Sequence, residues 1–345
     1  MTEPSGKSER KNPFKPIYDI CNSGGSNHKL VNLPDFPRYM DVELTNHCNF
    51  RCLMCWTGTG ASRRPKGFMS EQTWQKLLDE IQEHKTPLRF IRWGEPTLHP
   101  KYLDFIGQAK RLGITGHLTT NGYLLKESAL EQLVELPLDS IKFSLQGIDA
   151  ATYRQMRNID GFDQVLENVR RLFRLRGEGL RPYIHVSTSI THETREQVEE
   201  FRLAVAKYCD LVSVGRTKLE HIDLDRTRLS EEEKERWRIL MDQQTIARRH
   251  FECIEIFDKL SINWDGSVSA CCGDYDNLML VGHLENESLK DIWRGPTISY
   301  YRRMLADWRH DDLPLCRTCY DVTGELKNLV PVSRPSVEAS APVRP

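Results

Sequence analysis

The sequence predicts an α/β protein, a partial (β/α)6 barrel of the TIM type followed by a small cysteine-rich domain made of a β-hairpin and short helices. Two observations carry this prediction. Strand-like and helix-like segments alternate along residues 38–217, which is typical of parallel βαβ units. Beyond residue 230 the pattern changes to a charged helix, a hairpin and closely spaced cysteines. The 345 residues can form one large core and a smaller second one.

Composition excludes several classes of function. The chain is 39% hydrophobic and 28% charged with a formal net charge of -1, so we expect no nucleic-acid or membrane surface driven by charge. No apolar run approaches the roughly 18–20 residues that a membrane span needs. Residues 1–15 are polar and charged, unlike a signal peptide. We therefore expect a cytoplasmic protein whose ten cysteines are reduced thiols.

The first segments along the chain set the pattern. Residues 1–36 are interpreted as a polar N-terminal extension with a flexible joint at 24–27, too short for an independent domain. Alternation predicts the first strand over 39–45. Ser70 is a good N-cap for a helix over 71–84. That helix has one apolar stripe, formed by Trp74, Leu77, Leu78 and Ile81.

Five more strands are predicted downstream, over residues 88–92, 114–120, 140–145, 184–190 and 211–214. Helical periodicity separates them, for example at Leu103, Ile106, Ala109 and Leu112 before Gly113. Six such units form the predicted barrel over residues 37–228. The carboxyl ends of its strands are the expected place of the site.

The second unit is predicted over residues 229–326. A capping box at 230–233 opens a charged helix that runs to about residue 250. A hairpin follows over 260–264 and 267–270 around an Asp-Gly turn, and then a short helix near 288–293. Residues 327–345 lack periodicity and are predicted to be a disordered tail.

Three cysteines follow the first strand with the spacing C-x3-C-x2-C: Cys48, Cys52 and Cys55. Three thiolates can hold a [4Fe-4S] cluster and leave its fourth iron without a protein ligand. A structural zinc ion would need a fourth protein ligand, which His47 could supply. The polar, loop-like flanking residues argue against cysteines that only pack.

This loop resembles the cluster motif of the radical S-adenosylmethionine (SAM) enzymes, C-x3-C-x-Φ-C, with Met54 at the Φ position. Trp93-Gly94-Glu95-Pro96, after the second strand, is similar to the family's Gly-Gly-Glu-Pro motif, which binds the methionyl amino group. The resemblance implies that Glu95 accepts the ammonium and that Gly94 permits a close backbone approach. Trp93 departs from the motif, because the family has glycine there.

Three further positions are similar to cofactor contacts of the family: Asn121, Ser144 and Arg157. Read as single residues, they are equally a turn residue, a loop residue and a surface charge. The resemblance implies that the open iron chelates SAM. One electron, supplied by a flavodoxin or ferredoxin-type partner, then cleaves SAM to methionine and a 5'-deoxyadenosyl radical, which abstracts hydrogen from a substrate.

A second group of cysteines lies in the C-terminal unit: Cys253, Cys271 or Cys272, Cys316 and Cys319. A zinc ribbon is one interpretation, since it uses C-x2-C halves. The segment resembles the SPASM/twitch extension of the same superfamily, which implies one auxiliary [4Fe-4S] cluster and two [4Fe-4S] clusters in all. Cys271 is the preferred ligand, because it follows the hairpin at the family's spacing and adjacent residues of a strand point opposite ways. Cys272 is then a packing residue or a hydrogen donor to a substrate radical.

The short N-terminal extension favours a small hydroxylated substrate, such as a sugar or aminocyclitol, over a peptide. The expected reaction is dehydrogenation or epimerisation, with the auxiliary cluster handling electrons. A peptide- or protein-modifying maturase is the alternative, and a non-catalytic zinc-binding protein is a distant one. Several polar residues on or beside the strands could line the barrel: Glu43, Arg92, His117, Gln146, His185, Ser187 and Lys218.

Overall fold

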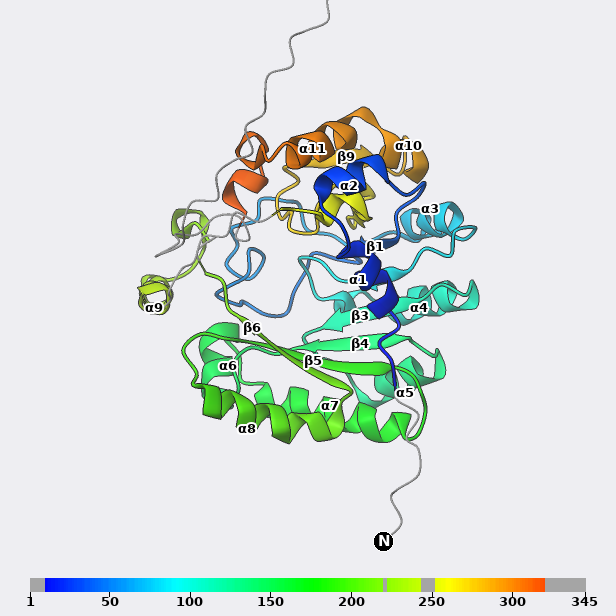
Figure 1. Ribbon diagram of the computed structural model, residues 1–345. Helices are drawn as coiled ribbons and strands as arrows, with labels where there is room; N and C mark the ends of the chain where they lie inside the picture. The colour runs from blue at the N-terminus through cyan, green and yellow to red at the C-terminus, as the bar shows by residue number, and fades with distance from the viewer. Residues whose placement is uncertain (1–9, 220–221, 243–251, 320–345) are drawn as a thin grey trace, which may run out of the picture.

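The computed structural model describes residues 10–219, 222–242 and 252–319 (Figure 1). Nine strands form one sheet in the order β6-β5-β4-β3-β2-β1-β7-β8-β9. The first six strands are β1 Tyr39–Val42, β2 Leu88–Phe90, β3 Gly116–Thr120, β4 Ser140–Ser144, β5 Tyr183–Ile190 and β6 Leu211–Arg216. Neighbours among these six pair in parallel, which confirms the predicted βαβ units.

The connecting helices cover the outer face of the parallel strands (Figure 1). They are α3 Glu71–Ile81, α4 Tyr102–Arg111, α5 Glu127–Glu135, α6 Ala150–Arg157, α7 Phe162–Arg176 and α8 Arg195–Val205. The apolar stripe of α3 is buried as expected. Sequence analysis missed α6, although Asp149 and Thr152 form a capping box at its start.

Alternation along the strands separates an apolar outer face from a polar inner face. On β4, Ile141 and Phe143 are fully buried, and Phe143 approaches Val165 of α7 across Gly122. Lys142, between them, therefore lies on the inner face. The barrel interior is thus lined by polar side chains, whereas the core lies between the sheet and the helices.

The cysteine-rich unit continues the same sheet. β7 Lys259–Ile262 pairs in parallel with β1, and β8 Ser267–Ser269 and β9 Leu280–His283 follow as antiparallel neighbours. Gly266 closes the predicted hairpin with a φ of +86°, a conformation that favours glycine. Helices α10 Leu289–Arg294 and α11 Pro296–Ala306 complete this part. The barrel strands and the hairpin therefore form one continuous hydrogen-bonded surface.

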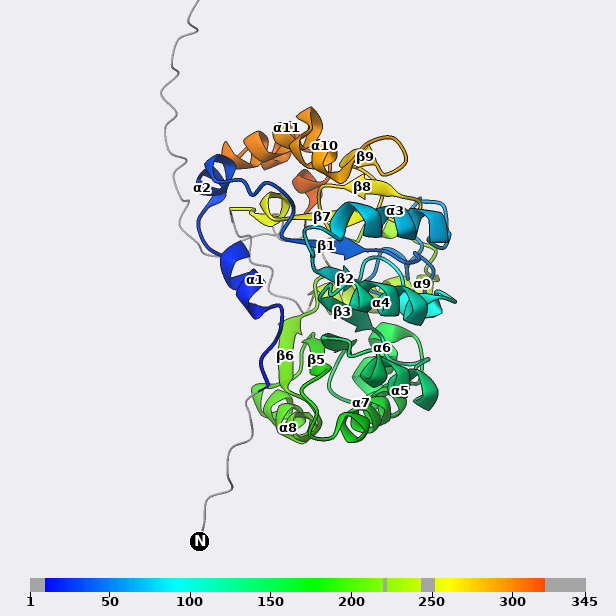
Figure 2. The ribbon, with the colours of Figure 1, turned by 90° about the vertical axis from the view of Figure 1, so that its right-hand side faces the viewer.

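The N-terminal extension contains two short helices that sequence analysis missed, α1 Lys15–Cys21 and α2 Ser26–Val31. They lie on the side of the strands opposite α3 and α4 (Figure 2). Lys29 of α2 and Arg38 bind the buried Asp258 carboxylate at 2.5 and 2.9 Å. The extension is thereby attached to the segment that precedes β7.

Two predictions fall partly or wholly outside the described residues. Helix α9 spans Glu231–Asp242, and residues 243–250 of the longer predicted helix are not described. The expected tail over 327–345 is also outside. In the part of the chain that is described, no helix has both the length and the apolar character that crossing a membrane requires.

Candidate active site

The first cysteine loop follows β1 at the carboxyl end of the strand. Cys52 is buried, and Cys48 and Cys55 are half-buried. Each of the three sulfurs has a hydrogen-bond donor nearby. The amide of Phe50 lies 3.5 Å from Cys48 Sγ, and Arg157 Nη1 lies 3.3 Å from Cys52 Sγ. The amides of residues 57 and 58 donate to Cys55.

The chemistry of these thiols fits an iron–sulfur cluster. Burial raises the pKa of Cys48 and the pKa of Cys55, and the neighbouring Cys52 adds to both shifts. Thiols with raised pKa values lose their protons when a metal binds them. Hydrogen bonds to the sulfurs are a usual feature of cluster sites. The loop thus presents three thiols and their hydrogen bonds on one turn.

The turn Trp93–Pro96 lies directly against this loop. A Cβ added at Gly94 would come within 2.1 Å of the carbonyl oxygen of Thr45 and 2.8 Å of the carbonyl oxygen of His47. Only glycine allows this approach. The amide of Glu95 donates to the His47 carbonyl oxygen at 2.8 Å, and Thr57 Oγ1 donates to the Trp93 carbonyl. Strand β2 therefore delivers the turn into contact with both ends of the cysteine loop.

The Glu95 carboxylate is buried, and its two oxygens accept different numbers of hydrogen bonds. Its Oε1 accepts bonds from the Thr97 amide, the Thr97 hydroxyl and the Thr120 hydroxyl, at 2.7–3.1 Å. Among the residues that the structure describes, the Asn121 amide alone donates to its Oε2, at 2.7 Å. Burial raises the pKa of Glu95, and these hydrogen bonds oppose the shift. Because Oε2 keeps a free acceptor site, a ligand ammonium would find both a hydrogen-bond acceptor and a poorly solvated charge to neutralise.

The structure brings Asn121, Ser144 and Arg157 to the same end of the sheet. The side chain of Asn121 donates to Asn49 Oδ1 at 2.9 Å and so contacts the cysteine loop. Arg157 Nη2 donates to the Ser144 carbonyl and hydroxyl oxygens, at 2.6 and 3.2 Å. Arg157 is therefore a buried residue that joins β4 to Cys52, and it is not a surface charge.

Met54 and Pro96 are held by packing. Met54 is half-buried against the core, and Pro96 is buried as the first residue of a 3-10 turn, Pro96–Leu98. The neighbouring Leu53 amide donates to the Met156 carbonyl oxygen of α6 at 2.9 Å. Helix α6 thus supports the cysteine loop through both Met156 and Arg157. The capping box at Asp149 was the signal that could have found this helix.

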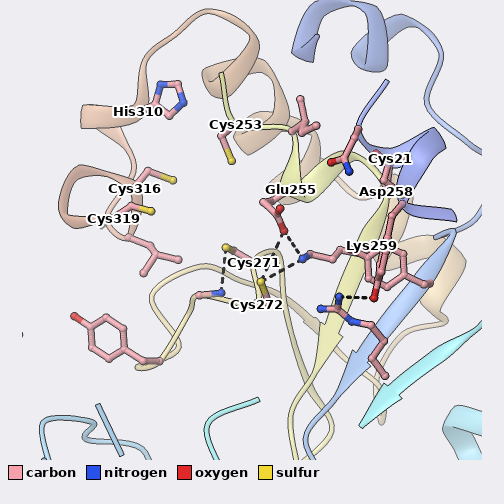
Figure 3. A pocket seen from close by; sticks show the side chains of 18 of the residues that line it. Cys21, Cys253, Glu255, Asp258, Lys259, Cys271, Cys272, His310, Cys316 and Cys319 are labelled. Atoms are coloured by element: carbon pink, nitrogen blue, oxygen red, sulfur yellow. Dashed lines mark hydrogen bonds and ion pairs between the residues drawn. The ribbon is translucent and has the colours of Figure 1, made fainter. Parts of the chain in front are cut away.

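A second cavity, of about 360 Å³, collects the distal cysteines (Figure 3). Cys253, Cys271, Cys316 and Cys319 line it together with Cys272. Burial raises the pKa of Cys253, and it raises the pKa of Cys316 to about 12. The charges of Cys316 and Cys319 raise the pKa of Cys253, and the charge of Cys253 raises the pKa of Cys271, so Cys253 lies near each of the other three thiols. Four grouped thiols suit a cluster with protein ligands at every iron.

Cys271 and Cys272 were expected to point opposite ways if the strand continues through them, and it does not continue that far. Strand β8 ends at Ser269, so the two cysteines lie beyond the regular alternation and both line the cavity. Cys272 lies on the side of Lys259, whose Nζ donates to its Sγ at 3.2 Å, and near Glu255 (Figure 3). A hydrogen bond from the Cys271 thiol and the ammonium of Lys259 lower the pKa of Cys272.

Two family profiles match the chain. The radical SAM superfamily profile matches residues 42–205, and the profile of the SPASM iron–sulfur cluster-binding domain matches residues 253–320. This chain belongs to the radical SAM superfamily and carries a SPASM domain. Such enzymes use SAM and [4Fe-4S] clusters, and their SPASM domains bind auxiliary clusters.

One curated relative matches over most of its length. It is the tungsten-containing aldehyde ferredoxin oxidoreductase cofactor-modifying protein of Pyrococcus furiosus, 25% identical over 327 residues that make up 82% of this chain and 87% of the relative.

Two solved structures share the fold. BtrN in complex with AdoMet and 2-DOIA has a TM-score of 0.55 at 17% identity, covering 82% of this chain and 93% of BtrN. Streptococcus suis SuiB bound to the precursor peptide SuiA has a TM-score of 0.60 at 16% identity, covering 88% of this chain and 74% of SuiB. At these identities, the two structures establish the likeness of the fold alone.

Proposed function

We propose that this radical SAM enzyme abstracts hydrogen from a small hydroxylated molecule, giving dehydrogenation or epimerisation. The observation that carries the proposal is the polar lining of the barrel interior, described below. The Pyrococcus relative is named a cofactor-modifying protein. Modification of a cofactor, and not of a peptide, agrees with this proposal. The substrate would lie inside the barrel, below the cysteine loop and the Gly94–Glu95 turn.

In this proposal Cys48, Cys52 and Cys55 hold the first cluster. Glu95 binds the SAM ammonium, and Asn121, Ser144 and Arg157 shape the rest of the cofactor site. Bound together, cluster and SAM supply a primary-carbon radical that can abstract hydrogen from a carbon centre. The protein positions that centre and keeps water away from it.

Side chains that hydrogen-bond line the inner faces of β3, β4 and β5. Thr119, Lys142 and His185 are register partners on adjacent strands. His185 Nε2 lies 2.7 Å from Ser213 Oγ, and burial lowers the pKa of His185 to about 4. His185 is therefore a neutral imidazole at pH 7. A hydrogen-bonding lining suits hydroxyl groups better than an apolar peptide side chain.

Lys142 places a cation in this lining. Burial lowers the pKa of Lys142 to about 8, so its ammonium is largely protonated at pH 7. Among the described residues, its ammonium forms neither a hydrogen bond nor an ion pair. We propose that this ammonium binds an oxygen of the substrate.

Several of the polar residues expected inside the barrel bind protein groups instead. Gln146 Nε2 donates to the Ser189 carbonyl oxygen at 2.9 Å and to Thr217 Oγ1. Glu43 forms a buried ion pair with Arg64, and the guanidinium of Arg92 reaches the carbonyl oxygen of Cys271. Glu43 and Arg92 therefore hold neighbouring segments in place and are not available to bind a substrate. His117 and His185 are the residues of that set that lie beside Lys142 on the inner face.

Cys253, Cys271, Cys316 and Cys319 would hold one auxiliary [4Fe-4S] cluster, the second cluster of the chain. With protein ligands at each iron it exchanges electrons and does not bind substrate. Held by these four cysteines, such a cluster would supply an acceptor for the electron left on the substrate radical in a dehydrogenation. A flavodoxin or ferredoxin-type protein is the proposed electron donor.

The second candidate is modification of a peptide. It is favoured by the likeness in fold to SuiB, whose structure holds a precursor peptide. Because the chain belongs to the radical SAM superfamily, we do not retain the alternative of a non-catalytic zinc-binding protein.

Mass spectrometry of candidate small molecules after turnover in deuterated solvent tests the proposal. A loss of two hydrogens indicates oxidation, and a gain of one deuterium in place of hydrogen indicates epimerisation. Lys142→Met should raise KM for the substrate about tenfold, as expected for a lost charged hydrogen bond. Turnover of a peptide, with every sugar and aminocyclitol unchanged, would contradict the proposal.

A further inference from the structure

The chain has a tryptophan where the family's SAM-binding motif has a glycine, and this indole contacts the loop that follows Cys272. Trp93 Nε1 donates to the Asp274 carbonyl oxygen at 3.1 Å. The main-chain carbonyl of Trp93 accepts the Thr57 hydroxyl, two residues after Cys55. One residue thus contacts the loop of the first cluster through its backbone and the loop after Cys272 through its side chain.

Arg92 makes a parallel connection. Its guanidinium donates to the carbonyl oxygens of Cys271 and Asp274, each at 3.0 Å, and to Asn263 Oδ1 at 2.8 Å. Arg92 and Trp93 immediately precede Gly94 and Glu95. Both long side chains of the turn therefore bind the segment that carries the proposed auxiliary ligand Cys271.

The receiving segment is itself rigid. The Asp274 carboxylate is fully buried and accepts bonds from Ser269 Oγ, the Leu278 amide and the Met279 amide at 2.8–2.9 Å. Next to it, Tyr275 stacks on Trp56, which follows Cys55, with ring centroids 3.6 Å apart and an interplanar angle of 3°. Because these contacts hold the segment in place, a movement of the turn is transmitted to Cys271.

The turn is equally constrained on its other side, because Gly94 fits between the backbones of Thr45 and His47 without room for a Cβ. We propose that Arg92 and Trp93 are positioning residues that couple SAM binding at this turn to the auxiliary cluster. Occupancy of either site then changes affinity at the other, and the effect is reciprocal. The inference rests on the proposed auxiliary cluster and is independent of the substrate.

A double-mutant cycle on SAM affinity tests the coupling. Cys316→Ser with Cys319→Ser removes the auxiliary cluster, and Trp93→Phe removes the indole N–H while keeping an aromatic ring. SAM dissociation constants are measured by calorimetry in the reconstituted wild type, the cluster-deficient protein, Trp93→Phe and the combined variant. Loss of the auxiliary cluster should weaken SAM binding about tenfold in the wild-type background and clearly less in the Trp93→Phe background, where the Arg92 contacts remain.

Iron analysis shows whether each variant still holds the auxiliary cluster, so that a lost coupling can be distinguished from a lost cluster. We expect about eight irons per chain in Trp93→Phe and about four in the cluster-deficient proteins, since each cluster holds four. Should Trp93→Phe itself lose auxiliary iron, Arg92→Lys replaces it in the same cycle.

Trp237→Phe is the matched control, because it also removes a buried indole, one whose Nε1 has no hydrogen-bond partner in the described structure. It should leave the tenfold effect intact. An equal loss of SAM affinity in the wild-type and Trp93→Phe backgrounds, or no loss in the wild type, would overturn the proposal.

Discussion

At the scale of single residues, the contact between Gly94 and the backbone of Thr45 is the tightest constraint on the cofactor site. In Gly94→Ala the new methyl group would lie 2.1 Å from a carbonyl oxygen, so the turn must move. We expect a loss of about 1–3 kcal/mol in the free energy of unfolding. We also expect SAM binding below detection by calorimetry, because Glu95 moves with the turn.

Gly215→Ala is the matched control for this substitution. An added Cβ there would meet its nearest atom, Ser189 Oγ, at 3.5 Å, an ordinary contact. That variant should bind SAM like the wild type. Wild-type SAM affinity in Gly94→Ala would show that the turn does not hold the cofactor.

The two adjacent cysteines make opposite predictions. Cys271→Ser should reduce iron from about eight to about four per chain, because it removes a ligand of the auxiliary cluster. Cys272→Ser should keep about eight irons, because Lys259 Nζ donates to the Cys272 sulfur at 3.2 Å and the other four thiols are the proposed ligands. Iron analysis after anaerobic reconstitution distinguishes them, and the reverse pattern would make Cys272 the ligand.

Lys142 predicts a pH dependence of stability. Its folded-state pKa of about 8 lies below the ordinary 10.5, so the folded protein binds fewer protons than the unfolded chain between these pH values. The free energy of unfolding therefore increases, through this group, as the pH rises from about 8 to 10.5. Lys142→Met should be more stable than wild type at pH 7, by about 1–3 kcal/mol, and the advantage should fade by pH 10.5. Denaturant unfolding of the apo-protein measures it; a constant difference across pH would contradict the assignment.

Residue-level features were predictable where they are local in sequence. The spacing of Cys48, Cys52 and Cys55 could be read directly, because a short loop constrains three ligands to one centre. The link from Trp93 to Asp274 could not, because its partners are 181 residues apart. The placement of both Cys271 and Cys272 along the cavity depends on where β8 ends, which the sequence pattern did not show.

At the scale of elements, helix α6 is the support of the first cluster loop. Arg157, in its last turn, donates to Cys52 Sγ at 3.3 Å. A positive hydrogen-bond donor at a cluster sulfur stabilises the reduced, more negative state. Arg157→Met should therefore lower the midpoint potential of the SAM-binding cluster, as measured by a redox titration followed by electron paramagnetic resonance.

Arg154→Met is the control on the same helix, because Arg154 is exposed and pairs with Asp160 on the surface. It should leave the potential unchanged. Equal potentials in Arg157→Met and the wild type would remove Arg157 from the cluster environment.

The predicted elements agree with the structure where periodicity is strong, as in α3 and the six parallel strands. Short helices such as α1, α2 and α6 were missed because six to eight residues give too few turns for a periodic signal. Their apolar contacts with the rest of the chain hold them in place.

At the scale of the whole molecule, the continuous sheet is what relates the two cysteine groups. Strand β1 carries the first loop and is also the parallel neighbour of β7, which begins the hairpin before Cys271. Buried charges reinforce this seam: Arg89 of β2 and Lys259 of β7 both lie beside the Asp41 carboxylate of β1, at 2.6 and 3.7 Å. Two units were expected from the change in composition, but that pattern could not reveal that they share a sheet.

The central claim is that one chain holds a SAM-cleaving cluster and an auxiliary cluster. Anaerobic reconstitution followed by reduction with dithionite in the presence of SAM tests it most directly. The account predicts about eight irons per chain and formation of 5'-deoxyadenosine, which is lost in Cys52→Ser. An anaerobically reconstituted protein that holds about four irons, or that forms no 5'-deoxyadenosine, would contradict it.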